Sequence, residues 1–392
     1  MLEMRCQETK VHLQLKDGEK LSMLIVGGSR MGKTYFASLL GDALIAKGDT
    51  VHLIDLGMKW SEDDKNRLRK RSATTYSVTN GFTVTLPFSS KEELCGCCRF
   101  IANALGFRSF RKIECLKNVF GRLAEQFGGY FNFHCVLSEL RKSASADDEA
   151  AELYSRLEGW AGADDLYFEV NENWLSSIEI TSNIWELDGF SDSHAKVMAQ
   201  MILYWLFCAR RRKNKLKEPS GRVFVIIDEF QDMDCTKDSA IGLLLTEGQK
   251  HQTFLILATQ FVKDRFSDAV ITQFKQGGFR VYFRLTEEEA REISKQLAYK
   301  ARDQSILYER LTNLPRGHCL VKGCHYLEGR REISEALRLV EIVDVPENVP
   351  ARKHKKAVVI RNKGRDFPGK AAGSTTGYRM KAYIMPEDCS ED

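Results

Sequence analysis

Residues 23–34 of the chain read Met-Leu-Ile-Val-Gly-Gly-Ser-Arg-Met-Gly-Lys-Thr, an apolar run that leads directly into a glycine-rich loop. Four consecutive apolar residues are typical of a strand that is buried on both faces. The loop fits the pattern G-x-x-x-x-G-K-[ST] in full, and a helix is predicted to follow it to about Lys47, before Gly48. A strand, a glycine loop and a helix in this order are the context that a phosphate-binding loop requires.

Such a loop suggests a nucleotide as ligand. Its glycines let backbone N–H groups turn inward around phosphates, and the positive end of the following helix points at them. Lys33 would place its charge at the β- and γ-phosphates, and the Thr34 hydroxyl would bind Mg²⁺. We therefore expect ATP and Mg²⁺ to bind here, with the nucleotide held by Gly27, Gly28, Ser29, Arg30, Met31, Gly32, Lys33, Thr34 and Tyr35.

Polar side chains follow two later apolar runs. Asp228 and Glu229 end the run at 223–227; Asp228 is expected to hold Mg²⁺, and Glu229 to activate the attacking water. A lone acidic pair would be weak evidence, but in a chain with a phosphate loop the catalytic interpretation is favoured. Gln260 ends the next run and could reach the γ-phosphate, although spacing alone favours an ordinary strand exit equally.

Hydrophobic periodicity indicates the organisation of the chain. A strand at 51–55 completes a β–α–β unit, which predicts a mainly parallel sheet. Between about 81 and 180, apolar residues recur at helical spacing, and strands are again expected at 184–187, 223–227, 254–258, 280–285 and 318–322. We predict the first part of an ATPase domain at 1–80, a helical insertion at 81–180, the second part of that domain at 181–345, and a basic, disordered tail at 346–392.

Composition is that of a soluble globular protein, with 43% hydrophobic and 29% charged residues. No apolar stretch reaches the roughly 20 residues of a membrane span, and the charged first residues predict no signal peptide. Eleven cysteines without a disulfide-scaffold spacing favour a reduced, cytoplasmic setting.

Two clusters of cysteine and histidine are weak candidates for metal sites. The cluster at 95–98 lacks a second ligand pair at zinc spacing, and Cys98 belongs to the apolar stripe of a predicted helix, so core packing is favoured. His318-Cys319 and Cys324-His325 flank a turn and could face each other across a hairpin. A metal site there is the less favoured alternative.

Basic residues are concentrated in three segments. Residues 351–386 hold ten Lys and Arg against one acid, and shorter clusters occur at 65–71 and 210–217. Each short cluster alone is more often a solvated helix face or a favourable helix end. Together with the tail they favour a polyanion partner, bound through phosphate contacts.

The order of motifs resembles the HerA–FtsK superfamily of DNA-pumping ATPases over about residues 20–345. It is carried by the loop at 24–34, the acidic pair in 227–230, Glu-Gly-Gln-Lys at 247–250 and Ile-Leu-Ala-Thr-Gln at 256–260. The similarity is greatest to the HerA, conjugative coupling-protein and type IV secretion ATPase branches. It implies an α/β P-loop NTPase of the RecA-like type with an inserted helical subdomain. It also implies a hexameric ring with ATP between subunits, and Gln260 as γ-phosphate sensor.

The sequence departs from this family in three ways. Many relatives have Arg-Lys before the sensor strand, where the Arg acts on the neighbouring subunit's ATP, but this chain has Gln249-Lys250. Lys250, or another residue such as Arg280 or Arg284, could take that role, or hydrolysis could be weak. The N-terminal barrel of HerA and the membrane helices of coupling proteins are not found. Arg30 replaces a small residue and could tune nucleotide preference or point to solvent.

We therefore expect a ring motor that hydrolyses ATP and translocates DNA in conjugation or another mobile-element process. The alternatives are an ATPase that acts with partner proteins in a secretion or assembly machine, or a nucleotide-dependent defence or switch component.

Overall fold

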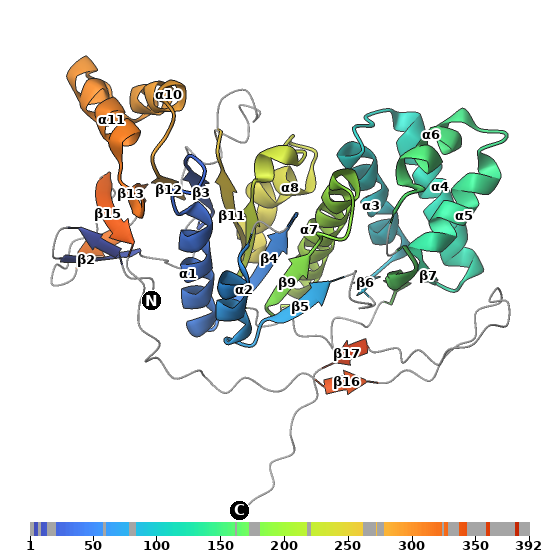
Figure 1. Cartoon of the computed structure of the whole chain (residues 1–392). Helices are drawn as coiled ribbons and strands as arrows, with labels where there is room; N and C mark the ends of the chain where they lie inside the picture. The colour runs from blue at the N-terminus through green and yellow to red at the C-terminus, as the bar shows by residue number, and fades with distance from the viewer. Residues whose placement is uncertain are drawn as a thin grey trace, which may run out of the picture. The chain divides into compact units, whose positions relative to one another are not determined.

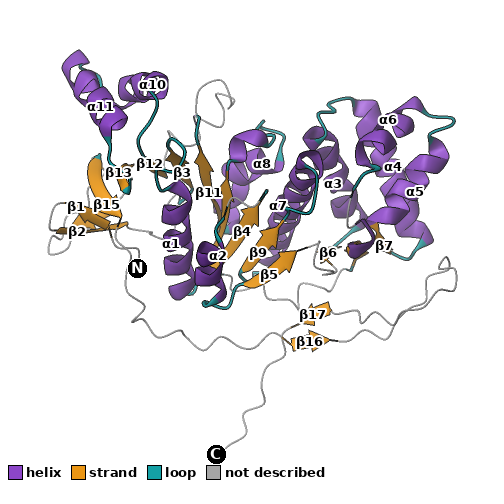
Figure 2. Cartoon of the chain, in the orientation of Figure 1, coloured by secondary structure: helices purple, strands orange, loops and turns teal. Residues whose placement is uncertain are grey.

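The computed structural model describes residues 21–57, 60–77, 84–160, 163–171, 181–217, 221–261, 278–323 and 337–342, with short pieces at 4–6, 9–13, 272, 325–327, 358–360 and 381–383. The chain divides into two compact units (Figures 1 and 2). The first unit comprises residues 1–76, 99–108 and 181–351, and the second comprises 77–98, 109–180 and 352–392.

The first unit is built on a twelve-stranded sheet whose centre is parallel (Figure 2). Six neighbouring strands run in the same direction, in the order β12 (Phe279–Tyr282), β3 (Met23–Val26), β11 (Thr253–Thr259), β10 (Val223–Asp228), β4 (Thr50–Asp55) and β9 (Asn183–Glu186). The prediction of a mainly parallel central sheet is confirmed. The phosphate loop follows β3, and the acidic pair Asp228-Glu229 lies at the end of β10. Because β11 lies between these two strands, the loop and the acidic pair are separated by one strand.

Beyond β12 the sheet continues with antiparallel strands. The strand predicted at 318–322 is the first of them, β13 (His318–Lys322). It is followed across the sheet by β15 (Arg338–Ile342), β1 (Met4–Cys6), β2 (Thr9–Leu13) and β14 (His325–Leu327). The short strand β5 (Thr74–Ser77) lies at the other edge, next to β9.

Helices cover both faces of the parallel centre. On one face, α1 (Lys33–Ala46) packs its buried side chains against alternate residues of the strands, among them Ile25, Leu53, Ile226 and Ile256. Helix α2 (Glu62–Arg69) contacts α1. On the other face, Trp205 of α7 (Asp192–Lys215) meets Trp185 of β9, and α8 (Ala240–Glu247) contacts β11. The strands are therefore buried on both sides, as their apolar runs predict.

Two further helices follow β12. These are α10 (Glu287–Leu297) and α11 (Ala301–Asn313), which contact each other. The predicted capping box is present, because the Thr286 side chain accepts a hydrogen bond from the Glu289 N–H. Two short 3₁₀ turns, η4 (Phe230–Asp232) and η5 (Gly248–His251), follow β10 and α8.

The second unit combines helices with a small sheet. Its helices are α3 (Lys91–Ala104, to residue 98), α4 (Phe110–Gln126), α5 (Phe133–Ser143) and α6 (Asp148–Leu157). Strands β6 (Val84–Phe88), β8 (Leu166–Val170) and β7 (Tyr130–Asn132) form a three-stranded sheet, and η2 (Ala163–Asp165) precedes β8. Phe120, Phe131 and Phe168 pack together in its core. The expectation of a mostly helical block missed this sheet.

The predicted basic tail lies largely outside the described residues. Two short strands, β16 (Val358–Ile360) and β17 (Lys381–Tyr383), pair antiparallel within it. Among the described residues, no helix is both long and apolar enough to cross a membrane.

Candidate nucleotide site

The phosphate loop connects β3 to α1 and is tied to two neighbouring strands. The Gly27 N–H donates to the Thr259 carbonyl at 3.2 Å, and the Gly28 N–H donates to the Arg284 carbonyl at 2.8 Å. A Cβ at Gly27 would lie 2.5 Å from the Cβ of Phe283, so a side chain there requires the backbone to move. Gly32 has φ 113°, a conformation that glycine adopts without strain. The loop therefore needs glycine at these two positions.

The remaining loop side chains differ in exposure. Arg30 is exposed with φ 60°, which is consistent with the interpretation that its side chain points to solvent. Ser29 is also exposed, and its hydroxyl donates to Gln260 Oε1 at 3.0 Å. Tyr35 lies on α1 and its ring is 5.6 Å from the guanidinium of Arg67 on α2. A contact of Tyr35 with a nucleotide stays a prediction.

Lys33, Thr34 and Asp228 meet where α1 begins and β10 ends. The Thr34 hydroxyl donates to Asp228 Oδ2 at 2.5 Å, so the two predicted Mg²⁺ ligands are already in contact. Lys33 Nζ donates to the Gly28 carbonyl at 3.2 Å. A hydroxyl and a carboxylate that leave the other positions to water and phosphate are typical Mg²⁺ ligands in nucleotide sites. The residues present therefore fit the ion.

Burial shifts the pKa values of both charged groups. It raises the pKa of Asp228, although the Thr34 hydrogen bond and the charge of Lys33 act in the opposite direction. Burial also lowers the pKa of Lys33, although Asp228 and Glu229 act in the opposite direction. Each charge is thus incompletely compensated, and a divalent cation beside Asp228 or a phosphate beside Lys33 would stabilise it.

Glu229 has a strained backbone and both of its carboxylate oxygens are hydrogen-bonded. Its φ of 55° and ψ of 37° are left-handed, a conformation that costs a non-glycine residue about 1–2 kcal/mol. Gln260 Nε2 donates to Glu229 Oε1 at 2.7 Å, and Gln231 Nε2 donates to Glu229 Oε2. Strain of this kind gathers at functional sites. Gln231 was not identified from the sequence. The only clue in the sequence was that an amide side chain follows Glu229 by two residues.

The three candidate trans-acting residues lie in different places. Lys250 is exposed in η5, before β11, whereas the phosphate loop lies at the carboxyl end of the strands. With about 3.3 Å per strand residue, it is roughly 20 Å from Gln260 at the other end of β11. Arg280 lies within β12 and hydrogen-bonds Tyr282. Arg284 is exposed directly after that strand, at the edge that carries its own phosphate loop.

The basic cluster at 65–71 is occupied by internal contacts. Lys65 Nζ is 2.8 Å from Asp55 Oδ2 and 3.2 Å from Glu186 Oε1, at the carboxyl ends of β4 and β9. Arg69 also pairs with Glu186, at 3.0 Å, and Arg71 pairs with Asp42 at 2.8 Å. The cluster balances acids of the sheet edge and of helix α1, so it is not a free surface for a polyanion.

The cysteine and histidine clusters show no metal site in the described part of the chain, where no group of three or more His, Cys, Asp or Glu side chains could hold an ion. Cys97 and Cys98 are fully buried, as core packing predicts. Cys319 is buried too, and Cys324 lies outside the described residues.

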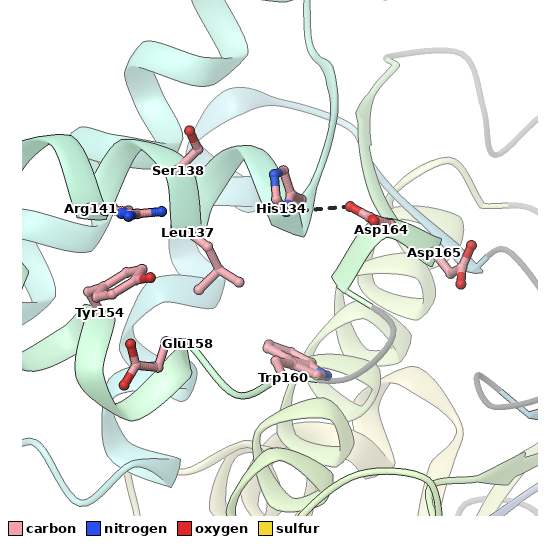
Figure 3. A pocket seen from close by; sticks show the side chains of 9 residues that line it. All are labelled: His134, Leu137, Ser138, Arg141, Tyr154, Glu158, Trp160, Asp164 and Asp165. Atoms are coloured by element: carbon pink, nitrogen blue, oxygen red, sulfur yellow. Dashed lines mark ion pairs between the residues drawn. The ribbon is translucent and has the colours of Figure 1, made fainter. Parts of the chain in front are cut away.

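A separate cavity of about 380 Å³ lies in the second unit and is lined by α5, α6, η2 and the segment after α6 (Figure 3). Three carboxylates line it, from Glu158, Asp164 and Asp165, against one guanidinium, from Arg141. His134 Nδ1 lies 3.5 Å from Asp164 Oδ1. This charge balance would repel a triphosphate, so the cavity does not compete with the phosphate loop as the nucleotide site.

The arrangement in the first unit can be compared with known proteins. No protein-family model and no curated protein sequence matches the chain. Solved structures match its fold: VirB4 of Thermoanaerobacter pseudethanolicus has a TM-score of 0.59 at 14% identity, over 86% of this chain and 99% of that one. The bacterial conjugative coupling protein TrwBdeltaN70 has a TM-score of 0.52 at 12% identity, over 86% and 92%.

The chain has the P-loop NTPase fold that VirB4 and the coupling protein TrwB share. A further match is plasmid coupling protein TrwB in complex with ADP and Mg²⁺, with a TM-score of 0.52 at 12% identity, over 86% of this chain and 92% of that one. Within this fold, the site brings together five side chains at the carboxyl edge of the parallel sheet, where ligands bind in open α/β folds: Lys33, Thr34, Asp228, Glu229 and Gln260. Identities this low establish the fold, so activity has to be argued from the site.

Proposed function

We propose that the chain is an ATP-hydrolysing motor that assembles as a hexameric ring and translocates DNA, in conjugation or a related mobile-element process. The observation that carries the ATPase assignment is the convergence of the phosphate loop with Asp228 and Glu229, with the Thr34 hydroxyl 2.5 Å from Asp228. Fold likeness to a bacterial conjugative coupling protein supports the choice of DNA.

Each group has a distinct task in hydrolysis. Backbone N–H groups of the loop bind the phosphates, and Lys33 can move from the Gly28 carbonyl to a phosphate oxygen. Thr34 and Asp228 are the residues that would hold Mg²⁺, and the ion would supply positive charge against the phosphates. Glu229 orients the attacking water and accepts its proton. Gln260 Oε1 accepts a hydrogen bond from the Ser29 hydroxyl of the loop, and this contact supports its proposed role as γ-phosphate sensor.

The position of Lys250 supports an assembly of several subunits. It is exposed at the edge of the sheet opposite its own phosphate loop, so it can contribute only to a neighbour's nucleotide. Arg284 is on the same edge as the loop and fits a role within its own subunit. A ring with ATP between subunits would use Lys250 in the role that an arginine has in related proteins.

Sequence and fold support DNA binding. The internal pairing of the basic residues at 65–71 favours the alternative of a protein substrate. The basic residues at 65–71 are engaged by Asp55, Glu186 and Asp42, which leaves the tail at 351–386 and the exposed end of the cluster at 210–217 as basic segments. A motor that acts on a protein would need no such segment. The tail is therefore the part whose removal should separate the two functions.

The test is steady-state ATP hydrolysis with and without single- and double-stranded DNA, together with the mass of the assembly. We expect DNA to stimulate turnover of a multimer, and deletion of 351–392 to weaken that stimulation. Turnover that is unaffected by either DNA and appears only with a partner protein would support the secretion or assembly alternative. Tight ATP binding with turnover near background would support the switch alternative that Gln249 suggests.

A further inference from the structure

Both carboxylate oxygens of Glu229, the predicted water-activating residue, already accept a hydrogen bond from a side-chain amide. Gln260 donates to Oε1 at 2.7 Å and Gln231 donates to Oε2. A carboxylate that activates water must offer that water an acceptor, and hydrogen bonds to charged acceptors are among the stronger ones in proteins. The chain without nucleotide therefore holds Glu229 between two amides, which we term the amide clamp.

The two amides of the clamp have different connections. Gln260 is also bound to the phosphate loop, because its Oε1 accepts from the Ser29 hydroxyl at 3.0 Å. No described contact links Gln231 to the loop, and its own Oε1 is buried with no hydrogen-bond partner. A γ-phosphate would compete for Ser29 and Gln260, and it would leave the contact of Gln231 intact.

The backbone around Gln231 fixes the direction of its side chain. Phe230 is fully buried, and its carbonyl accepts a hydrogen bond from the Met233 N–H at 2.9 Å, which closes the turn η4. The Glu229 N–H donates to Asp228 Oδ1 at 2.9 Å. Glu229 and Gln231 thus lie on either side of an anchored residue, in a turn that directly follows the Mg²⁺-binding Asp228.

We propose that Gln231 is a positioning residue that holds Glu229 Oε2, while Gln260 competes with the attacking water for Oε1 until a γ-phosphate draws Gln260 away. Glu229 then faces the attacking water with Oε2 held by Gln231 and Oε1 released from Gln260. This assignment rests on the proposed ATPase function.

The test replaces Gln231 with methionine, which has nearly the same shape and no N–H donor. Because a misplaced catalytic group costs up to about 100-fold in rate, we expect kcat to fall roughly 10- to 100-fold, with KM and the directly measured affinity for ATP unchanged. Gln231→Glu should lower kcat further, since it sets a second carboxylate against Glu229. Gln296→Met is the matched control, because Gln296 Nε2 donates to Glu292 Oε1 at 3.3 Å on the exposed helix α10.

Coupling to Glu229 separates positioning from a general effect on folding. In a Glu229→Gln background, Gln231→Met should cause no further loss of rate, because the group that it positions is gone. A kcat of Gln231→Met within twofold of wild type would overturn the proposal. The proposal would also be overturned if Gln231→Met lowered kcat as much in the Glu229→Gln background as in wild type, or if Gln296→Met lowered kcat as much as Gln231→Met.

A readout without turnover keeps this inference separate from the proposed function. If the wild-type chain hydrolysed no ATP, the ATPase proposal would fail, and amide hydrogen exchange of residues 229–233 in nucleotide-free protein would still test the clamp. Gln231→Met should speed exchange there while Gln296→Met leaves it unchanged. Equal exchange in wild type and Gln231→Met would show that the clamp does not hold this turn.

Discussion

Replacing Lys65 with methionine removes one charge from the carboxyl edge of the sheet and keeps most of the side chain's length. The Lys65 side chain is 6% exposed, and its partners Asp55 and Glu186 are 1% and 12% exposed. Removing one member of a buried ion pair costs about 3–5 kcal/mol, because the remaining charge is buried without compensation. Glu186 keeps Arg69, at 3.0 Å, so the loss should come mainly from Asp55.

We therefore expect a loss of about 3 kcal/mol in the free energy of unfolding of the first unit, which corresponds to a fall in Tm of roughly 6–12 °C. Burial alone would lower the pKa of Lys65, but hydrogen bonds and charges of Asp55 and Glu186 outweigh it and raise the pKa above its ordinary value of 10.5. The stabilisation is therefore complete at neutral pH and is lost as the pH rises through the raised pKa.

Urea unfolding of wild type, Lys65→Met and Lys65→Met/Asp55→Asn measures this effect. The double variant should recover part of the loss, because it removes the uncompensated charge. Lys295→Met, at an exposed position of α10, is the control and should stay within about 0.5 kcal/mol of wild type. A loss below about 1 kcal/mol in Lys65→Met, or no recovery in the double variant, would refute a structural role for this cluster.

Two further variants test the strain and the charge at the site. Glu229→Gly should be more stable than Glu229→Ala by about 1 kcal/mol in thermal unfolding, because only glycine adopts φ 55° without cost; the opposite order would contradict the left-handed backbone. Asp228→Asn should raise stability at neutral pH in the absence of nucleotide. Burial raises the pKa of Asp228 above 3.8, so wild-type stability falls as the pH rises from 3.8 through the raised pKa, and this fall should be absent from Asp228→Asn. An unchanged pH profile would show that Asp228 is not the group responsible.

Local patterns predicted the parts of the fold whose signals are contiguous in sequence. The strand, glycine loop and helix at 23–46 were found because burial on both faces requires an unbroken apolar run and phosphate binding requires glycine. Thr286 was recognised as a helix cap because its partner is only three residues away. The strand that carries Asp228 was found for the same reason, since five apolar residues precede it.

The features that were missed have three causes: contacts between residues far apart in sequence, very short strands, and a local backbone conformation. The cluster at 65–71 looked like a solvated face because its acidic partners, Asp55 and Glu186, come from different strands. The small sheet of the second unit was missed because strands of three to five residues leave almost no alternation to detect. The sequence shows that Gln231 follows Glu229 by two residues, but it does not show that their side chains meet. Their contact depends on the left-handed backbone of Glu229, which spacing does not reveal.

The most direct test of the account is the steady-state rate of ATP hydrolysis by wild type, Lys33→Ala and Glu229→Gln, measured beside equilibrium binding of ATP. We expect wild type to bind and hydrolyse ATP with Mg²⁺, Lys33→Ala to lose both, and Glu229→Gln to bind ATP while kcat falls at least about 100-fold. Full activity of Lys33→Ala, or turnover in Glu229→Gln equal to wild type, would contradict the assignment of this loop and this carboxylate as the ATPase site.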